Sequence, residues 1–277
     1  MQKWKLILQN SSTEKNLLNK QGMKKDTPSS NKPFERWLYQ SLCEWLSMNT
    51  AFTTFLEIVI ISVLNINPMY EWSERWKERE ERYKHLINTW KDKTIPAKML
   101  SDLVQLMQEN HKEKKDIIWE MYENFICQWE HGQFFTPPHI ADFMSKIIEV
   151  EEVEAWKSVC DIACWSGKLL MWALRNNPRV NLIGVDIDRR CAMMSCINCL
   201  FYGGCGTFLV WNTLCNEYED WWRVSYWMLY EIPKEQLQNI EIKTTPTDSP
   251  KPEEIQPEKK EEIREFAVWE WIQKSLF

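Results

Sequence analysis

The sequence predicts an α/β protein in which a helical region precedes a parallel sheet, and two apolar runs carry this prediction. The first run, Val159–Ile162, is followed by the small residues Ser166 and Gly167 and then by apolar residues at helical spacing. The second run, Val180–Asp186, follows that predicted helix and ends in a carboxylate. Strand, tight loop, helix and strand in this order are typical of a doubly wound sheet, whose loop presents backbone N–H groups to a nucleotide-like ligand.

Apolar residues recur every three or four positions through much of the region before the sheet, which predicts helices. Residues 1–33 are polar, and we expect a mobile arm there. Helical periodicity begins at Phe34, and the next predicted helices cover residues 52–66, 70–92, 96–110 and 117–129. The charged helix over residues 70–92 is either a solvated face or a surface that meets DNA or a partner subunit. Residues 34–130 are therefore predicted to form an α-helical N-terminal domain.

The longest apolar run, Phe52–Ile66, contains Glu57 and is too short to cross a bilayer, so it predicts a buried helix. The first residues, Met1–Lys5, lead into a polar stretch without the cleavage site of a secretory leader. We therefore expect a cytoplasmic protein that makes no contact with a membrane.

The nine cysteines are an odd number, and reduced thiols are expected. Cys196 and Cys199 have the spacing of metal ligands, but they fall with Cys191 on a predicted helix, where small buried residues are common. A buried helix face is favoured over a structural zinc site, so no metal is expected.

The net charge excludes one class of function, and the positions of the glycines indicate which segment binds a ligand. The 277 residues suffice for one large or two modest domains, and the net charge of −6 argues against a protein that coats DNA nonspecifically. Six of the seven glycines lie between Gly132 and Gly206. Because glycine permits close approach of the backbone to a ligand, this segment is the expected ligand-binding domain.

A second motif, Gly132–Pro137 with the sequence Gly-Gln-Phe-Phe-Thr-Pro, precedes the first predicted strand. Thr136 can cap the helix expected from His139 to Glu149, and a proline in the first turn of a helix is tolerated. Phe134 and Phe135 could serve only as a hydrophobic staple for this helix. A ligand-binding role is favoured, because the motif precedes a strand–loop–helix unit of the matching type.

The loop Asp161-x-Ala163-Cys164-x-Ser166-Gly167 resembles the first motif of S-adenosylmethionine (SAM)-dependent adenine-N6 DNA methyltransferases, as found in modification subunits of type I restriction systems and in related phage enzymes. Gly132–Pro137 resembles the Phe-x-Thr-Pro cofactor motif of that family, and Gly184–Asp188 resembles its ribose-binding strand end. The order and spacing of the three motifs match over roughly residues 115–220.

The resemblance implies a Rossmann-like SAM-methyltransferase sheet, here partial, in residues 131–235, with SAM as the cofactor. It assigns cofactor contacts to ten positions, at the three motifs and at the end of a third predicted strand. These are Phe135, Thr136, Pro137, Asp161, Ala163, Ser166, Gly167, Asp186, Ile187 and Asn212. Asp186 would bind the ribose hydroxyls, and Asn212 would lie near the adenine ring. Asn198, on the helix predicted from Arg190 to Tyr202, resembles a family position that packs behind the cofactor, or it is simply a polar residue on a helix face.

The chain departs from the family at the catalytic motif and in the cofactor loop. No Asn/Asp-Pro-Pro-aromatic tetrapeptide, which holds the flipped adenine in the family, follows the cofactor motifs. Trp165 and Trp211 stand where the family has glycine, and an indole at position 165 could fill the pocket for the methionine end of SAM. The sheet is also expected to be cut short, since only three strands are predicted.

These departures leave alternatives open for the activity. The first is a DNA adenine-N6 methyltransferase of the restriction–modification type, which by itself is expected to be weakly active or inactive. The second is a noncatalytic, methyltransferase-like partner subunit or a truncated remnant. A small-molecule SAM methyltransferase is disfavoured by the Phe-Phe-Thr-Pro motif.

The end of the chain is rich in aromatic and then in charged residues. Residues 221–230 carry an aromatic patch, which could stack on flipped bases but more often marks a core or a subunit interface. We expect a disordered linker at residues 236–262 and an amphipathic helix at residues 263–277. The expected partners are DNA, contacted through a partner subunit, and other chains in a hetero- or homo-oligomer formed by these aromatic surfaces.

Overall fold

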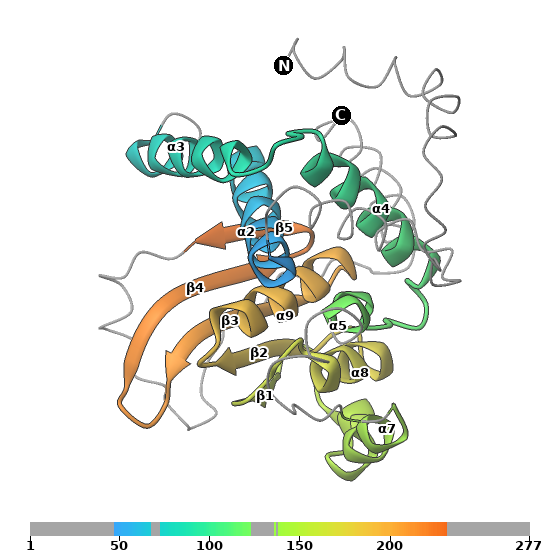
Figure 1. The fold of residues 1–277 in the computed structure, drawn as a ribbon. Helices are drawn as coiled ribbons and strands as arrows, with labels where there is room; N and C mark the ends of the chain where they lie inside the picture. The colour runs from blue at the N-terminus through green and yellow to red at the C-terminus, as the bar shows by residue number, and fades with distance from the viewer. Residues whose placement is uncertain (1–46, 68–72, 123–135, 137, 232–277) are drawn as a thin grey trace, which may run out of the picture.

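The structure is a computed structural model (Figure 1), and it describes residues 47–67, 73–122, 136 and 138–231. The arm predicted at residues 1–33, the linker at residues 236–262 and the helix at residues 263–277 lie outside the described residues and stay predictions.

Five strands form one sheet in the described part of the chain, in the order β1-β2-β3-β4-β5. They are β1 (Ser158–Asp161), β2 (Asn181–Asp186), β3 (Cys205–Asn212), β4 (Glu217–Ser225) and β5 (Met228–Glu231). β1, β2 and β3 run parallel, and β4 and β5 extend the sheet from β3 as an antiparallel hairpin. The chain is therefore a mixed α/β protein, as predicted.

The prediction of only three strands was wrong, because the aromatic stretch forms β4 and β5. Trp222 of β4 lies opposite Phe208 of β3 and is buried at 3% exposure, whereas Tyr226 is 52% exposed. The turn between the two strands is Tyr226-Trp227, with φ of 43° and 70°. Two-residue hairpin turns with two positive φ values usually contain asparagine and glycine. This turn has neither, so the usual sequence signal of a hairpin is missing.

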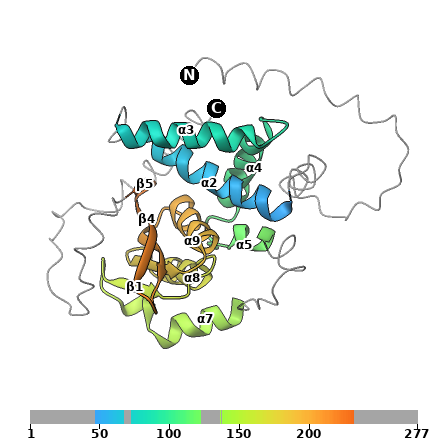
Figure 2. The same ribbon diagram turned by 60° about the vertical axis from the view of Figure 1, so that its left-hand side comes forward.

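Helices occupy the region before the sheet and the connections within it. In chain order they are α2 (Met48–Ile66), α3 (Glu74–Asn88), α4 (Ile95–Glu109), α5 (Ile117–Tyr122), α7 (Pro138–Ile147), the 3-10 helix η5 (Val150–Glu152), α8 (Lys168–Asn176) and α9 (Arg189–Phe201). α8 connects β1 to β2, and α9 connects β2 to β3. The views in Figures 1 and 2 agree that α7 lies at the end of the molecule away from α3.

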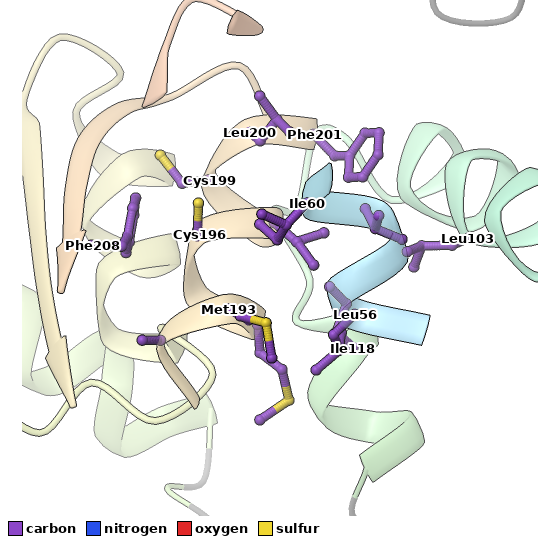
Figure 3. Packing of buried hydrophobic residues seen from close by; sticks show 14 of the residues in the cluster. Leu56, Ile60, Leu103, Ile118, Met193, Cys196, Cys199, Leu200, Phe201 and Phe208 are labelled. Carbon is purple, nitrogen blue, oxygen red and sulfur yellow. The ribbon is translucent and has the colours of Figure 1, made fainter. Parts of the chain in front are cut away.

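α9 is buried on all sides, because it lies between the sheet and α2. Every residue from Cys191 to Phe201 is buried. Figure 3 shows Phe208 of β3 on one side of α9 and Leu56 and Ile60 of α2 on the other. The cysteines of α9 are therefore core residues with free thiols. The helix has no polar face of the kind that a solvent-exposed helix would have.

α2 is long and apolar enough to cross a membrane by length and composition alone, but 56% of its apolar window, Asn49–Ile66, is buried inside the protein. The helix begins at Met48, and the Ser47 hydroxyl caps it by accepting a hydrogen bond from the backbone N–H of Thr50 at 3.1 Å. The apolar run Phe52–Ile66, which was judged too short to cross a bilayer, is therefore shorter than the helix that contains it. α2 packs on α3, α9 and β5, so the predicted buried helix is confirmed.

The helical region and the sheet share one apolar core. Buried side chains from α2, α4, α5, α8, α9 and the strands form a single contact cluster. Two polar contacts also join the regions: the side-chain amide of Asn67 donates to the carbonyl of Leu229 at 3.0 Å, and Arg79 pairs with Glu231 at 2.7 Å. The start of the described chain is thus packed against its end, and the division at residue 130 stays a prediction.

Candidate functional site

Polar residues end each of the three parallel strands, at the same edge of the sheet. Asp161, Asp186 and Asn212 are the last residues of β1, β2 and β3. Exposed apolar side chains follow two of them directly, Ile162 at 68% exposure and Ile187 at 67%. In doubly wound sheets, ligands bind at the carboxyl ends of the parallel strands. This edge therefore combines hydrogen-bonding groups with solvent-facing apolar surface.

The loop between β1 and α8 is attached to β2 through its backbone. The N–H of Cys164 donates to the carbonyl of Val185 at 2.9 Å, and the N–H of Trp165 donates to Oδ2 of Asp186 at 2.9 Å. Within the loop, the N–H of Ala163 donates to Oδ1 of Asp161 at 3.2 Å. The predicted residues Asp161, Ala163 and Asp186 are thus brought together, although mainly by contacts that shape the loop.

Asp186 is nearly buried and already holds two backbone groups. Its Oδ1 accepts from the N–H of Asp188 at 2.8 Å, and its Oδ2 accepts from Trp165. The residue is 8% exposed, and burial raises the pKa of its carboxyl group. Each carboxylate oxygen keeps a further lone pair, so binding of a ribose hydroxyl remains chemically open to it.

Ser166 points into the protein and contacts a residue that the sequence did not single out. Its hydroxyl donates a hydrogen bond to Oδ2 of Asp116, and its own exposure is 3%. Asn198 of α9 donates from Nδ2 to Oδ1 of Asp116 at 2.8 Å and to the carbonyl of Ser166 at 3.0 Å. The structure thus places Asn198 against the loop, while its predicted position behind the cofactor stays a prediction, and Ser166 has its hydroxyl turned away from solvent.

Asp116 could have been noticed as a helix cap. It stands directly before the apolar residues of α5, and its Oδ1 accepts from the N–H of Trp119 at 3.0 Å. An aspartate three residues ahead of the N–H that it binds is a common start of a helix. Its link to Ser166 joins positions 50 residues apart, and no local pattern reports such a contact.

Gly167 is required by packing inside the protein. Its φ is +84°, and a Cβ atom there would lie 2.3 Å from Oγ of Ser195 on α9. A side chain at this position would therefore collide with α9 before any ligand is considered. The structure gives the glycine a role in seating the loop on α9, while its predicted cofactor contact stays a prediction.

Trp165 occupies a backbone conformation that glycine would adopt without strain. Its φ is 51°, and its ring meets the ring of Trp119 edge-on, with centroids 5.7 Å apart. The indole is partly buried and packs against the core. The side chain is thus directed toward α5, and its predicted obstruction of the cofactor remains to be tested.

The remaining predicted positions lie at the rim of this edge or outside the described residues. Oδ1 of Asn212 accepts from the N–H of Leu214 at 3.1 Å, which closes a tight turn after β3. Thr136 is described and half-buried, ahead of α7, which begins at Pro138. Phe135 and Pro137 lie outside the described residues, and so their predicted contacts cannot be placed.

A comparison with protein families matches residues 113–218 of this chain to the N-6 DNA Methylase family. The match covers the loop, the three parallel strands and both crossover helices, and it begins just before Asp116. The family inferred from the three sequence motifs is therefore confirmed for this segment. The searches of curated proteins and of solved structures gave no match.

Proposed function

We propose that this chain, whose residues 113–218 match the N-6 DNA Methylase family, binds SAM at the carboxyl edge of β1, β2 and β3 and serves DNA adenine-N6 methylation of the restriction–modification type. The observation that carries the proposal is the arrangement at this edge, where Asp161, Asp186 and Asn212 end adjacent parallel strands. A Rossmann-like sheet uses this edge for nucleotide-like ligands.

The residues at the edge fit the parts of SAM. The free lone pairs of Asp186 suit ribose hydroxyls, and the exposed side chain of Ile187 suits one face of the adenine ring. Asn212 lies at the end of the next strand, where its amide could meet the adenine edge. When bound, SAM would supply the methyl group. The chain's own contribution is to hold and orient that donor.

Methyl transfer by the chain alone is expected to be weak or absent. The segment after the cofactor motifs contains no Asn/Asp-Pro-Pro-aromatic tetrapeptide. An enzyme that modifies a base must hold the flipped base in a fixed orientation, and this chain has no recognised group for that step.

Isothermal titration with SAM tests the cofactor site. We expect one-to-one binding by the wild type and weakening of about tenfold in Asp186→Asn, because one charge-assisted hydrogen bond to the ribose is worth about 1.5 kcal/mol. Leu214→Ser is the matched control, since this side chain is 95% exposed at the same edge. Binding by Trp165→Gly alone would show that the indole blocks the site. Absence of binding by both proteins would refute the proposal.

A second candidate function is that of a methyltransferase-like subunit completed by another chain. In the described part of the chain, β1 lies at an edge of the sheet, whereas the corresponding strand of a doubly wound sheet has strands on both sides. α7 packs on α8 and η5, and it exposes an apolar stripe. The stripe consists of Ile140, Phe143, Met144 and Ile147 of α7 and of Ile148 directly after the helix, each at least 40% exposed. Contiguous apolar surface of this kind marks interaction sites.

The two candidates differ in what restores methyl transfer to DNA. If a partner completes the sheet, an extract of the source cells should raise radiolabelled methyl incorporation above its own background when wild type is added. The double variant Phe143→Ser/Ile147→Ser should fail to do so while still binding SAM. Equal incorporation with both proteins, or none with either, would contradict the partner-subunit function.

A further inference from the structure

We infer that Asp116 is a positioning residue that holds the loop between β1 and α8 in its ligand-binding shape. The inference rests on the SAM site proposed above, and it extends that site to a residue about 50 positions upstream of the loop. Asp116 lies outside the β1–α8 loop itself and outside all three sequence motifs. It acts through Ser166 and Asn198, and it touches no ligand itself.

Three donors converge on the buried carboxylate. Asp116 is 6% exposed; its Oδ1 accepts from Asn198 and from the N–H of Trp119, and its Oδ2 accepts from the Ser166 hydroxyl. The Asn198 amide also donates to the carbonyl of Ser166. Ser166 is therefore held at both its side chain and its backbone, which fixes the peptide that leads into Gly167.

The network joins the loop to two rigid elements. Asp116 caps α5, and Asn198 lies on α9, where every residue from Cys191 to Phe201 is buried. Movement of the loop would break hydrogen bonds to groups with no access to water, and such groups are costly to leave unpaired. The two residues before Ser166 are attached to β2, because the N–H of Cys164 donates to the carbonyl of Val185 and the N–H of Trp165 donates to Asp186. The loop is thus hydrogen-bonded both to β2 and, through Ser166, to the buried residues Asp116 and Asn198.

Charged and titratable groups around the carboxyl set its response to pH. Lys168 of α8 favours the ionised form, as do the three hydrogen bonds, whereas burial opposes it more strongly and raises the pKa of Asp116 to about 6. Tyr202, directly after α9, and Glu120 of α5 also lie near this carboxyl group, and burial raises the pKa of Tyr202, with the charges of Asp116 and Glu120 adding to the shift. When the loop is held against Asp116, the buried carboxyl group binds a proton more tightly than it would if the loop moved away and water reached it. Acid should therefore favour the conformation in which the loop is held against Asp116.

Hydrogen exchange on the full chain tests this role. The readout is the protection of the amides of residues 163–168, with the amides of β3 as the internal reference for global stability. Asp116→Ala should lower loop protection at least tenfold and weaken SAM binding by a similar factor, while the chain stays folded and the amides of β3 stay better protected than those of the loop. Asp116→Asn can accept from Asn198 and Trp119 and donate to Ser166, so it should restore both quantities to within about threefold of wild type.

The pH profile supplies a readout that a purely space-filling role would not change. Between pH 7.5 and pH 5, after correction for intrinsic exchange, loop protection should rise in wild type and stay flat in Asp116→Asn. The inference is overturned if Asp116→Ala changes loop protection and SAM affinity less than twofold, or if both proteins show the same pH profile.

Two further outcomes separate this inference from the proposed function. If Asp116→Ala unfolds and β3 loses protection too, Ser166→Ala decides, because it removes only one hydroxyl; an unchanged loop in that variant overturns the inference. If the loop loosens as expected but wild type binds no SAM at any pH, the cofactor proposal fails while the positioning of the loop by Asp116 is upheld.

Discussion

At the scale of single residues, Trp165 shows how a loop can hold a bulky side chain in a backbone conformation that favours glycine. The residue has φ of 51°, which costs an L-residue about 1–2 kcal/mol. Its ring contact with Trp119 and its partial burial offset that cost. The loop therefore adopts at Trp165 a conformation that glycine takes without strain, and an aromatic contact compensates for the strain.

The comparison of glycine and alanine at position 165 tests this account. Both variants lose the indole, but only alanine keeps the left-handed strain, so Trp165→Gly should be more stable than Trp165→Ala by about 1 kcal/mol. Trp172, inside α8, is the control, since there the order should reverse by about 1 kcal/mol. Urea denaturation measures the four free energies of unfolding. Alanine equal to or better than glycine at position 165 would argue against strain.

At the scale of elements, local sequence pattern was sufficient to predict the parallel part of the sheet and its crossover helices. The apolar runs located β1 and β2 to within about a residue, which is inside the usual spread at element ends, and the sequence pattern predicted helices where α8 and α9 lie. β4 and β5 were missed because Tyr226 and Trp227 take a turn that asparagine and glycine usually form. The turn is fixed by tertiary packing, since Trp227 lies against Gly203 and the His111 ring.

The candidate site likewise contains residues that could be named from the sequence and contacts that could not. The family resemblance named Asp161, Asp186 and Asn212 as cofactor contacts, and the structure shows that they end three adjacent strands. The hydrogen bonds of Asp116 could not be predicted, because they join segments that are distant in the chain. The burial of Ser166 was also not foreseeable, since a serine in a loop usually faces solvent.

The ion pair between α3 and β5 has a measurable effect on stability. Arg79 has a nearly buried side chain, and its Nη1 lies 2.7 Å from Oε2 of Glu231. Glu231→Gln should lower the free energy of unfolding by about 1–3 kcal/mol, because it removes a counter-charge from a nearly buried guanidinium. Glu74→Gln removes an exposed pair with Lys77 on the same helix and should cost less than about 0.5 kcal/mol. Equal losses from thermal or urea unfolding would contradict this difference.

At the scale of the whole molecule, the buried Asp116 and the half-buried His111 should make stability depend on acid in opposite directions. Burial raises the pKa of Asp116 to about 6 from an ordinary value of 3.8. Its contribution is therefore complete at low pH and is lost as pH rises from about 4 to about 6, up to about 3 kcal/mol. Burial lowers the pKa of His111 to about 4 from 6.5, with Lys114 adding to the shift. That contribution is complete above pH 6.5 and is lost as pH falls toward 4.

Single substitutions should separate these two effects. Wild type should show a shallow profile of unfolding free energy between pH 4 and pH 6.5, since the two slopes oppose each other. Asp116→Asn should become steadily less stable toward acid, and His111→Gln should become steadily less stable toward pH 6. Urea denaturation at half-unit intervals of pH gives the profiles. Slopes of the same sign in both variants would rule out the assignment.

The position of α2 has a consequence for how the protein is made. This helix is apolar, and its packing partners include α9 and β5, with Asn67 bound to a carbonyl 162 residues further along the chain. During translation the helix leaves the ribosome long before those partners exist, and chains synthesised from the N-terminus expose such surface in the interval. The nascent polypeptide should therefore need a chaperone to shield α2 until β5 has emerged.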